Sequence, residues 1–213
     1  MEAYNNIRAS NISRYSCLSH NQLLGAQVAL TTADSTTVLK RHLRRVSGSP
    51  CWGVTAEFGT YLTLKFGPPS LEIREARPDA KHKTFHRRRV FLNGQHKLWI
   101  DMSDWEILEG KRQRYHSGQG RAQLRLAANL IDGQILVGFS LALRPLRSTF
   151  TFDEGSRLIT TRYRKAKPDW ELWHLYSPRS YVGLRSDGNL KFGRLLGPGG
   201  LAATKATVTD FSI

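Results

Sequence analysis

The chain has 213 residues, of which 40% are hydrophobic and 23% charged, so its composition excludes a disordered polypeptide and accommodates one generous domain or two small halves sharing a core. No run approaches about 18 consecutive apolar residues, and the first 30 residues lack the pattern of a secretory signal, so we expect a cytoplasmic protein without a membrane partner. An excess of 32 Lys and Arg over 17 Asp and Glu gives a formal net charge of +15, which favours nucleic acid or another polyanion as a partner.

The N-terminal region is polar and weakly patterned. We predict that residues 1–48 form a polar arm that ends in a short basic helix, because Leu39, Leu43 and Val46 recur at helical spacing and Gly48 follows them.

The two cysteines, Cys17 and Cys51, form neither a CxxC motif nor a disulfide framework. A reducing compartment favours free thiols at both positions, although the sequence alone leaves a pairing between them open.

From Cys51 the hydrophobic period changes to two, which predicts a β-rich domain over residues 49–194. Gly67–Pro69 is predicted to be a turn, and Asn93–Gly94 and Asp187–Gly188 are predicted to be tight hairpin turns. The alternation predicts the following core residues: Leu62, Leu64, Phe66, Val137, Phe139, Phe150, Phe152 and Leu172.

A second helix is predicted over residues 119–131, where Leu124, Ala127 and Ile131 form an apolar stripe and Gly133 suits the position just past the end. The Gly-rich residues 195–213 are predicted to form a loosely held tail.

The β-rich domain contains two similar stretches, about 51–108 and 134–193. Phe66 and Phe152 lie in matching strings 86 residues apart, and Leu71 is predicted to correspond to Leu158 and Leu98-Trp99 to Leu172-Trp173. The predicted fold class is therefore mainly β (α+β), with two similar antiparallel β-hairpin units joined by a helix and a short basic N-terminal helix.

The strings FGTYLTLKFG, LEIRE and HKLWI, which begin at Phe58, Leu71 and His96, resemble those of a family of small bacterial hypothetical proteins. The resemblance spans roughly residues 50–190 and continues through the segment around Gly133 and the segment around Trp173. Its motifs are strand edges, turns and buried aromatics, so it implies a fold and no catalytic residue.

Four basic clusters stand out, with aromatic residues among them, and such clusters can neutralise phosphates while rings stack on bases. The alignment places the clusters 81–89 and 162–167 in matching loops, so we expect them to line one side of the protein. The predicted nucleic-acid-binding residues are Lys81, Lys83, Arg87, Arg88, Arg89, Arg112, Arg114, Arg162, Arg164, Lys165 and Lys167.

We therefore predict a non-catalytic basic binding module or accessory subunit that contacts nucleic acid and takes no cofactor or metal. An alternative is an immunity-like or accessory module that binds an acidic protein partner within a larger assembly. A remote alternative is a metal-dependent nuclease, since Asp79, Glu109 and Lys111 imitate a PD…ExK arrangement. The choice between DNA and RNA, the oligomeric state and the pathway stay open.

Overall fold

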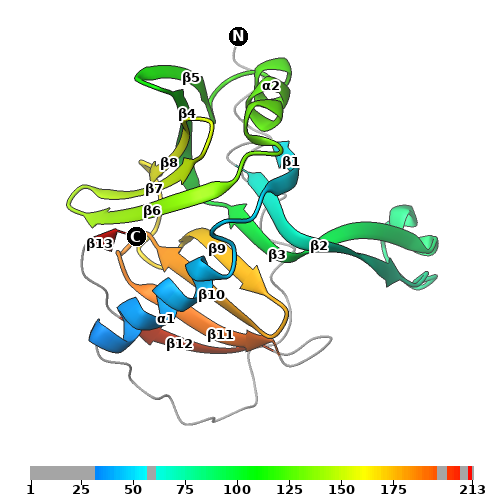
Figure 1. Ribbon diagram of the computed structural model, residues 1–213. Helices are drawn as coiled ribbons and strands as arrows, with labels where there is room; N and C mark the ends of the chain where they lie inside the picture. Colours follow the sequence, from blue (N-terminus) through cyan, green and yellow to red (C-terminus); the bar gives the residue numbers. More distant parts are fainter. Residues whose placement is uncertain (1–31, 57–60, 196–200, 207–210, 213) are drawn as a thin grey trace.

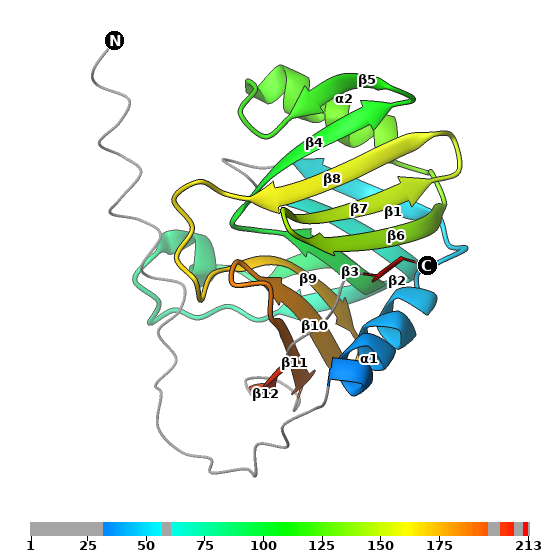
Figure 2. The same ribbon diagram turned by 90° about the vertical axis from the view of Figure 1, so that its left-hand side faces the viewer.

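The computed structural model describes residues 32–56, 61–195, 201–206 and 211–212, and it contains two antiparallel sheets stacked face to face (Figures 1 and 2). The seven-stranded sheet has the order β1 (Cys51–Ala56), β2 (Leu62–Arg74), β3 (Arg89–Ile100), β9 (Glu171–Ser177), β10 (Ser180–Arg185), β11 (Leu190–Leu195) and β12 (Leu201–Ala206). The six-stranded sheet has the order β13 (Phe211–Ser212), β6 (Leu136–Leu143), β7 (Leu146–Phe152), β8 (Ser156–Arg162), β4 (Ser103–Glu109) and β5 (Arg112–His116).

One hydrophobic core fills the space between the sheets. Phe66 of β2, Phe150 of β7 and Trp173 of β9 are fully buried in it. Helix α1 (Thr32–Arg44) packs against β9 and β10, and helix α2 (Arg121–Ile131) packs against β1 and β5. Helix α1 adds Leu39 and Leu43 to the core, and α2 adds Leu124, Ala127, Ala128 and Ile131. The predicted mainly β class with two helices is confirmed.

The two halves of the chain exchange strands between the sheets. The first half gives β1, β2 and β3 to the seven-stranded sheet and then crosses over to add β4 and β5 to the six-stranded sheet. The second half gives β6, β7 and β8 to the six-stranded sheet and crosses back with β9 and β10. The prediction of two similar units is confirmed, and the units are interlocked. The seven-stranded sheet joins three strands of the first half to four of the second, and the six-stranded sheet joins two strands of the first half to four of the second.

The point where the halves meet has matching hydrogen bonds. Pro50 and Ile135, which are 85 residues apart, form an isolated antiparallel bridge. The Gly48 N–H donates to the Leu136 carbonyl (2.9 Å), and the Gly133 N–H, 85 residues further on, donates to the Cys51 carbonyl (2.8 Å). Both glycines have positive φ (76° and 92°), so the same helix-to-strand turn recurs in each half.

The strand registers correct part of the sequence alignment. Phe66 and Phe152 hold equivalent places, since each lies in the second strand of its unit and pairs with the first, at Cys51 and Leu136.

The other two matches of the sequence alignment, Leu71 with Leu158 and Leu98-Trp99 with Leu172-Trp173, are wrong. Leu158 pairs with Phe150 as Leu98 pairs with Leu64, so Leu158 corresponds to Leu98 and not to Leu71. Leu98-Trp99 and Leu172-Trp173 lie on adjacent strands that pair with each other, as at Ile100 and Trp173.

Two predicted turns are strand residues instead. β2 and β3 run as one long hairpin through Gly67–Pro69 and through Asn93–Gly94, and its register shifts between Phe66 and Pro69. A Cβ on Gly94 would lie 2.9 Å from the Lys65 Cβ and from the Phe66 and His96 carbonyl oxygens. Glycine is therefore needed at position 94 for the close approach of two backbones. Asp187–Gly188 does connect β10 and β11, and Gly188 has φ 81°.

Val137 was wrongly predicted to be a core residue. It is 51% exposed because the register between β6 and β7 shifts between Leu136 and Gly138, which leaves Val137 as the extra residue and puts Leu136 in the core. The other seven predicted core residues are buried.

The segment predicted as a tail contributes strands to both sheets, since β12 pairs with β11 and β13 pairs with β6. The predicted polar arm over residues 1–31 and Cys17 lie outside the described residues. Cys51 is a buried free thiol whose Sγ donates to the Ile131 carbonyl (3.1 Å), and burial raises its pKa to about 12.

Candidate nucleic-acid interface

The hairpin of β2 and β3 extends well beyond the sandwich, and we call residues 67–95 the arm (Figure 1). Within the described residues, the pairing of β1 with β2 ends at Phe66 and that of β9 with β3 ends at Lys97, so the two strands of the arm pair only with each other. The arm carries seven Lys and Arg residues against three Asp and Glu residues.

One face of the arm is a ladder of alternating arginine and phenylalanine side chains. The Arg77 guanidinium lies 4.8 Å from the Phe85 ring centre, and Arg89 lies between Phe85 (5.1 Å) and Phe91 (4.7 Å). Arg74 completes the ladder at 4.6 Å from Phe91. The flat faces of the guanidinium groups are thus held against rings, which leaves the N–H donors at their edges to other partners. For Arg74 one such partner is the Glu72 carboxylate, which accepts from its Nε at 2.6 Å.

The ladder borders a hollow of about 400 Å³ near the end of the arm. It is lined by four arginines, one carboxylate and one ring: Arg74, Arg77, Arg87, Arg89, Glu75 and Phe85. Glu75 is drawn toward Arg88 by an ion pair of 2.9 Å whose partners are both 66% exposed, so this pair contributes little to stability. The hollow therefore presents a surplus of positive charge, as a binding site for anionic groups requires.

The predicted binding residues do not form one surface. Lys81, Lys83, Arg87, Arg88 and Arg89 belong to the arm. Arg112 and Arg114 lie on β5, at the opposite side of the molecule (Figure 1), and Arg114 forms an ion pair with Glu109 at 2.6 Å.

The four remaining predicted residues, Arg162, Arg164, Lys165 and Lys167, lie in the connection from β8 to β9 or at its start. That connection does not correspond to the arm, because the counterpart of the arm in the second half is the short turn between β7 and β8, at residues 153–155. The expectation of matching loops on one side is therefore wrong.

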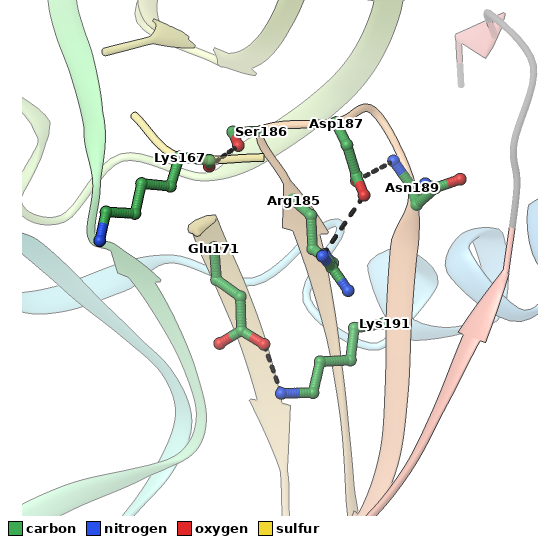
Figure 3. A network of polar contacts seen from close by, with 7 residues as sticks. All are labelled: Lys167, Glu171, Arg185, Ser186, Asp187, Asn189 and Lys191. Atoms are coloured by element: carbon green, nitrogen blue, oxygen red, sulfur yellow. Dashed lines mark hydrogen bonds and ion pairs between the residues drawn. The ribbon is translucent and has the colours of Figure 1, made fainter. Parts of the chain in front are cut away.

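The β8–β9 connection is instead anchored to the β10–β11 turn. The Ser186 hydroxyl donates to the Lys167 carbonyl (Figure 3), and the Arg162 guanidinium donates to the Ala166 carbonyl at 3.0 Å. A hollow of about 610 Å³ lies beside this turn, lined by Arg144 and Arg162 but also by Asp187. This hollow has two arginines against one aspartate, whereas the hollow of the arm has four arginines against one glutamate, so the arm offers the more positive site.

A row of rings crosses the outer face of the seven-stranded sheet, and we call it the aromatic row: Tyr61, Trp99, His174, Tyr176 and Tyr181. The first four are near-parallel, and Tyr181 is tilted by 47° against His174. Trp99 stacks with Tyr61 (6.0 Å, 29°) and His174 (5.7 Å, 28°), and His174 stacks with Tyr176 (5.5 Å, 18°). Trp99, His174 and Tyr176 alternate along β3 and β9 with the core residues Leu98, Trp173 and Leu175, which places the row on the side turned away from the six-stranded sheet.

The ladder and the aromatic row share one face of β3. Residues two apart on a strand point the same way, so Arg89, Phe91, Lys97 and Trp99 are on a common side. The Lys97 ammonium lies 5.7 Å from the Trp99 ring centre and 5.0 Å from that of Tyr176. Burial lowers the pKa of Lys97. The charges that act on its ammonium include Glu72 and Arg74 of the arm, so Lys97 connects the ladder and the aromatic row electrostatically.

The far end of the row is held by an ionic cluster. Glu171 accepts from His174 Nε2 (3.0 Å) and pairs with the Lys191 ammonium (2.6 Å; Figure 3). Burial by itself would raise the pKa of Glu171, but the bonds from His174 and Lys191 outweigh it and lower the pKa to about 2. Burial raises the pKa of the neighbouring Asp101 to about 6. Glu171 thus carries a fixed negative charge that orients the ring of His174.

The residues that would imitate a PD…ExK nuclease site do not come together. Asp79 lies in the arm, whereas Glu109 and Lys111 lie at the β4–β5 turn on the other side of the molecule (Figure 1). Among the described residues, no group of three or more His, Cys, Asp or Glu side chains could hold a metal ion. The helices in the described part of the chain are also too short and too polar to span a membrane.

Sequence reasoning identified the charges of the 81–89 cluster but missed Arg74, Arg77, Trp99 and Tyr176. Alternation within each strand could have placed Trp99 and Tyr176 on polar faces. It could not show that β3 and β9 are neighbours.

Comparisons with protein-family models, curated proteins and solved structures found no match for this chain. The resemblance to small bacterial proteins stays a prediction.

Proposed function

We propose that the protein binds nucleic acid through its arm, as a non-catalytic module. The arginine–phenylalanine ladder carries this proposal, because it holds three guanidinium groups on one exposed ribbon beside a hollow lined by a fourth. Arginine forks match phosphate oxygens, and rings between them offer surfaces to bases.

The overall charge supports the same partner. A formal charge of +15 attracts a polyanion over distances beyond the contact surface, and the arm gives that attraction a projecting point of contact. A two-stranded ribbon that pairs with no other strand is marginally stable alone, so contact with a partner would also stabilise the arm.

The test uses two triple variants with the same loss of charge. Arg77→Gln, Arg87→Gln and Arg89→Gln remove cations from the hollow, whereas Arg112→Gln, Arg164→Gln and Lys165→Gln remove exposed cations elsewhere. Binding of labelled oligonucleotides is measured at several salt concentrations. Each lost phosphate contact should reduce the salt slope by about 0.9 on duplex DNA or about 0.7 on a single strand.

We expect the arm variant to lose most of its affinity for oligonucleotides and to show a salt slope reduced by up to three phosphate contacts. The control variant should bind nearly as the wild type does. Equal effects of the two variants, or no binding by the wild type at low salt, would contradict the proposal.

The opposite face of the arm favours a second candidate function, that of a protein-interaction module. Leu71, Ile73, Val90 and Leu92 form two cross-strand pairs there and are 68%, 57%, 57% and 50% exposed. Exposed aliphatic residues grouped in this way mark interaction surfaces.

This candidate is separated from the first by the double variant Leu71→Ser and Leu92→Ser. If a protein partner uses the aliphatic face, the variant loses that partner in nuclease-treated purifications from native extract and keeps its affinity for oligonucleotides.

A further inference from the structure

We propose that the nucleic acid bound by this protein is single-stranded, and that its bases stack on the aromatic row while its backbone follows the ladder of the arm. This inference rests on the proposed function and names its substrate class.

The duplication provides an internal comparison for the aromatic row. In the seven-stranded sheet, Thr63 pairs with Trp99, which pairs with His174. At the equivalent places of the six-stranded sheet, Thr149 pairs with Ile159, which pairs with Glu106.

The same registers make Leu108 the counterpart of Tyr176. The same arrangement of strands is therefore built without rings in the other sheet. Because the fold does not require aromatic residues at these positions, the aromatic row points to a ligand.

The geometry of the rings suits unpaired bases. The planes of Tyr61, Trp99, His174 and Tyr176 are within 30° of their neighbours. His174 and Tyr181 are buried, so the rings that a base can reach are the half-buried Tyr61, Trp99 and Tyr176. Every unpaired base has a flat face that can stack on such rings. A duplex covers these faces by its own stacking and offers base edges and phosphates instead.

The cations lie where a single strand would need them. Lys97 is between the ladder and the aromatic row, with its ammonium 5.7 Å from the Trp99 ring centre. At the other end Lys191 is paired with Glu171, so Lys97 is the cation that joins the row to the ladder. Along β3 the ten steps from Arg89 to Trp99 span roughly 33 Å at about 3.3 Å per residue. One strand of nucleic acid can therefore contact arginines on the arm and rings on the sheet at the same time.

The decisive variant exchanges two rings for the residues of the other repeat, Trp99→Ile and Tyr176→Leu. Both replacements already occur at the matching positions of the six-stranded sheet, so the fold should tolerate them. Leu108→Ala, at the position equivalent to Tyr176, is the matched control, and thermal unfolding shows whether each variant folds. If the double variant does not fold, Tyr176→Leu alone serves in its place.

Each protein is titrated with the same oligonucleotide sequence, single-stranded or annealed to its complement. For the wild type we expect the single strand to bind at least about 10-fold more tightly than the duplex. The ring variant should lose about 10-fold or more in affinity for the single strand, since stacking contributes about that much per base. Its affinity for the duplex and its salt slope should not change.

Equal affinity of the wild type for single strand and duplex would overturn this inference, as would a ring variant that binds the single strand like the wild type. The arm variants separate this failure from that of the proposed function. If the arginine substitutions still flatten the salt slope, nucleic-acid binding stands and only the single-strand assignment falls.

Discussion

At the scale of single residues, two neighbouring carboxyl groups at the end of the aromatic row are shifted in opposite directions. Glu171 accepts bonds from His174 and Lys191, which favour its charged form and lower its pKa. Burial disfavours the charged form of Asp101 and raises its pKa, and the nearby Glu171 carboxylate adds to this rise. One carboxylate therefore stabilises the folded state when it is charged, and the other destabilises it.

The two signs predict opposite pH dependences for two isosteric variants. The folded pKa of Glu171 is about 2 against an ordinary value of 4.5, so its contribution is present above pH 4.5 and lost as the pH falls toward 2. Glu171→Gln should lower the free energy of unfolding at neutral pH and match the wild type at the acid end. The measurement is urea unfolding across this pH range.

The folded pKa of Asp101 is about 6 against an ordinary 3.8, so its favourable contribution is present below pH 3.8 and lost as the pH rises through 6. Asp101→Asn should therefore be more stable than the wild type above pH 6, and this gain should vanish below pH 3.8 in the same urea series. If the free energy of unfolding at neutral pH changed in the same direction in both variants, the causes given for the two pKa shifts would be contradicted.

At the scale of elements, the arm depends on a tight crossing at its base. β2 shifts register between Phe66 and Pro69, and Gly94 of β3 lies against the backbone there. This crossing joins the sheet to the arm without interrupting either strand. The common face of β3, with its cations and rings, depends on that continuity.

Gly94→Ala should destabilise the protein by about 1–3 kcal/mol, because its Cβ would lie 2.9 Å from the Lys65 Cβ and from two backbone carbonyl oxygens. Gln95→Ala, at the exposed neighbouring position, should change stability by about 0.5 kcal/mol or less. Urea denaturation of both variants checks the difference. A Gly94→Ala protein as stable as the wild type would show that the base of the arm has room to move.

At the scale of the whole molecule, the exchange of strands makes the halves mutually dependent. β3 needs β9 as its neighbour, and β8 needs β4. The core between the sheets joins Phe66 from the first half to Phe150 and Trp173 from the second. Neither half can bury its apolar residues by folding alone.

Cleavage between β5 and α2 should therefore give two fragments, residues 1–118 and 119–213, that do not unfold cooperatively in isolation. Mixing them should restore a cooperative transition and the near-ultraviolet circular dichroism of the intact chain. The fragments are compared separately and at equal concentration with the intact protein. A cooperative transition in either isolated fragment would argue against interlocked halves.

Much of the fold could be predicted from alternation, since Leu62, Leu64, Phe66 and Phe150 are core residues as expected. Predictions failed at irregularities. Val137 follows the alternation but lies in a bulge, and Asn93–Gly94 has the composition of a turn but lies within a strand. Such positions are decided by the partner strand, which local patterns do not describe.

The sequence by itself determined the mainly β class, the two helices, the resemblance between the halves and the concentration of positive charge near residues 81–89. These features depend on periodicity and composition, which are set by residues close together in the sequence. Only the tertiary structure decided that the halves exchange strands and that Trp99 lies beside His174 and Tyr176. It also decided that the basic segments separate in space, because pairing between distant strands depends on a register that core packing and backbone hydrogen bonds select together.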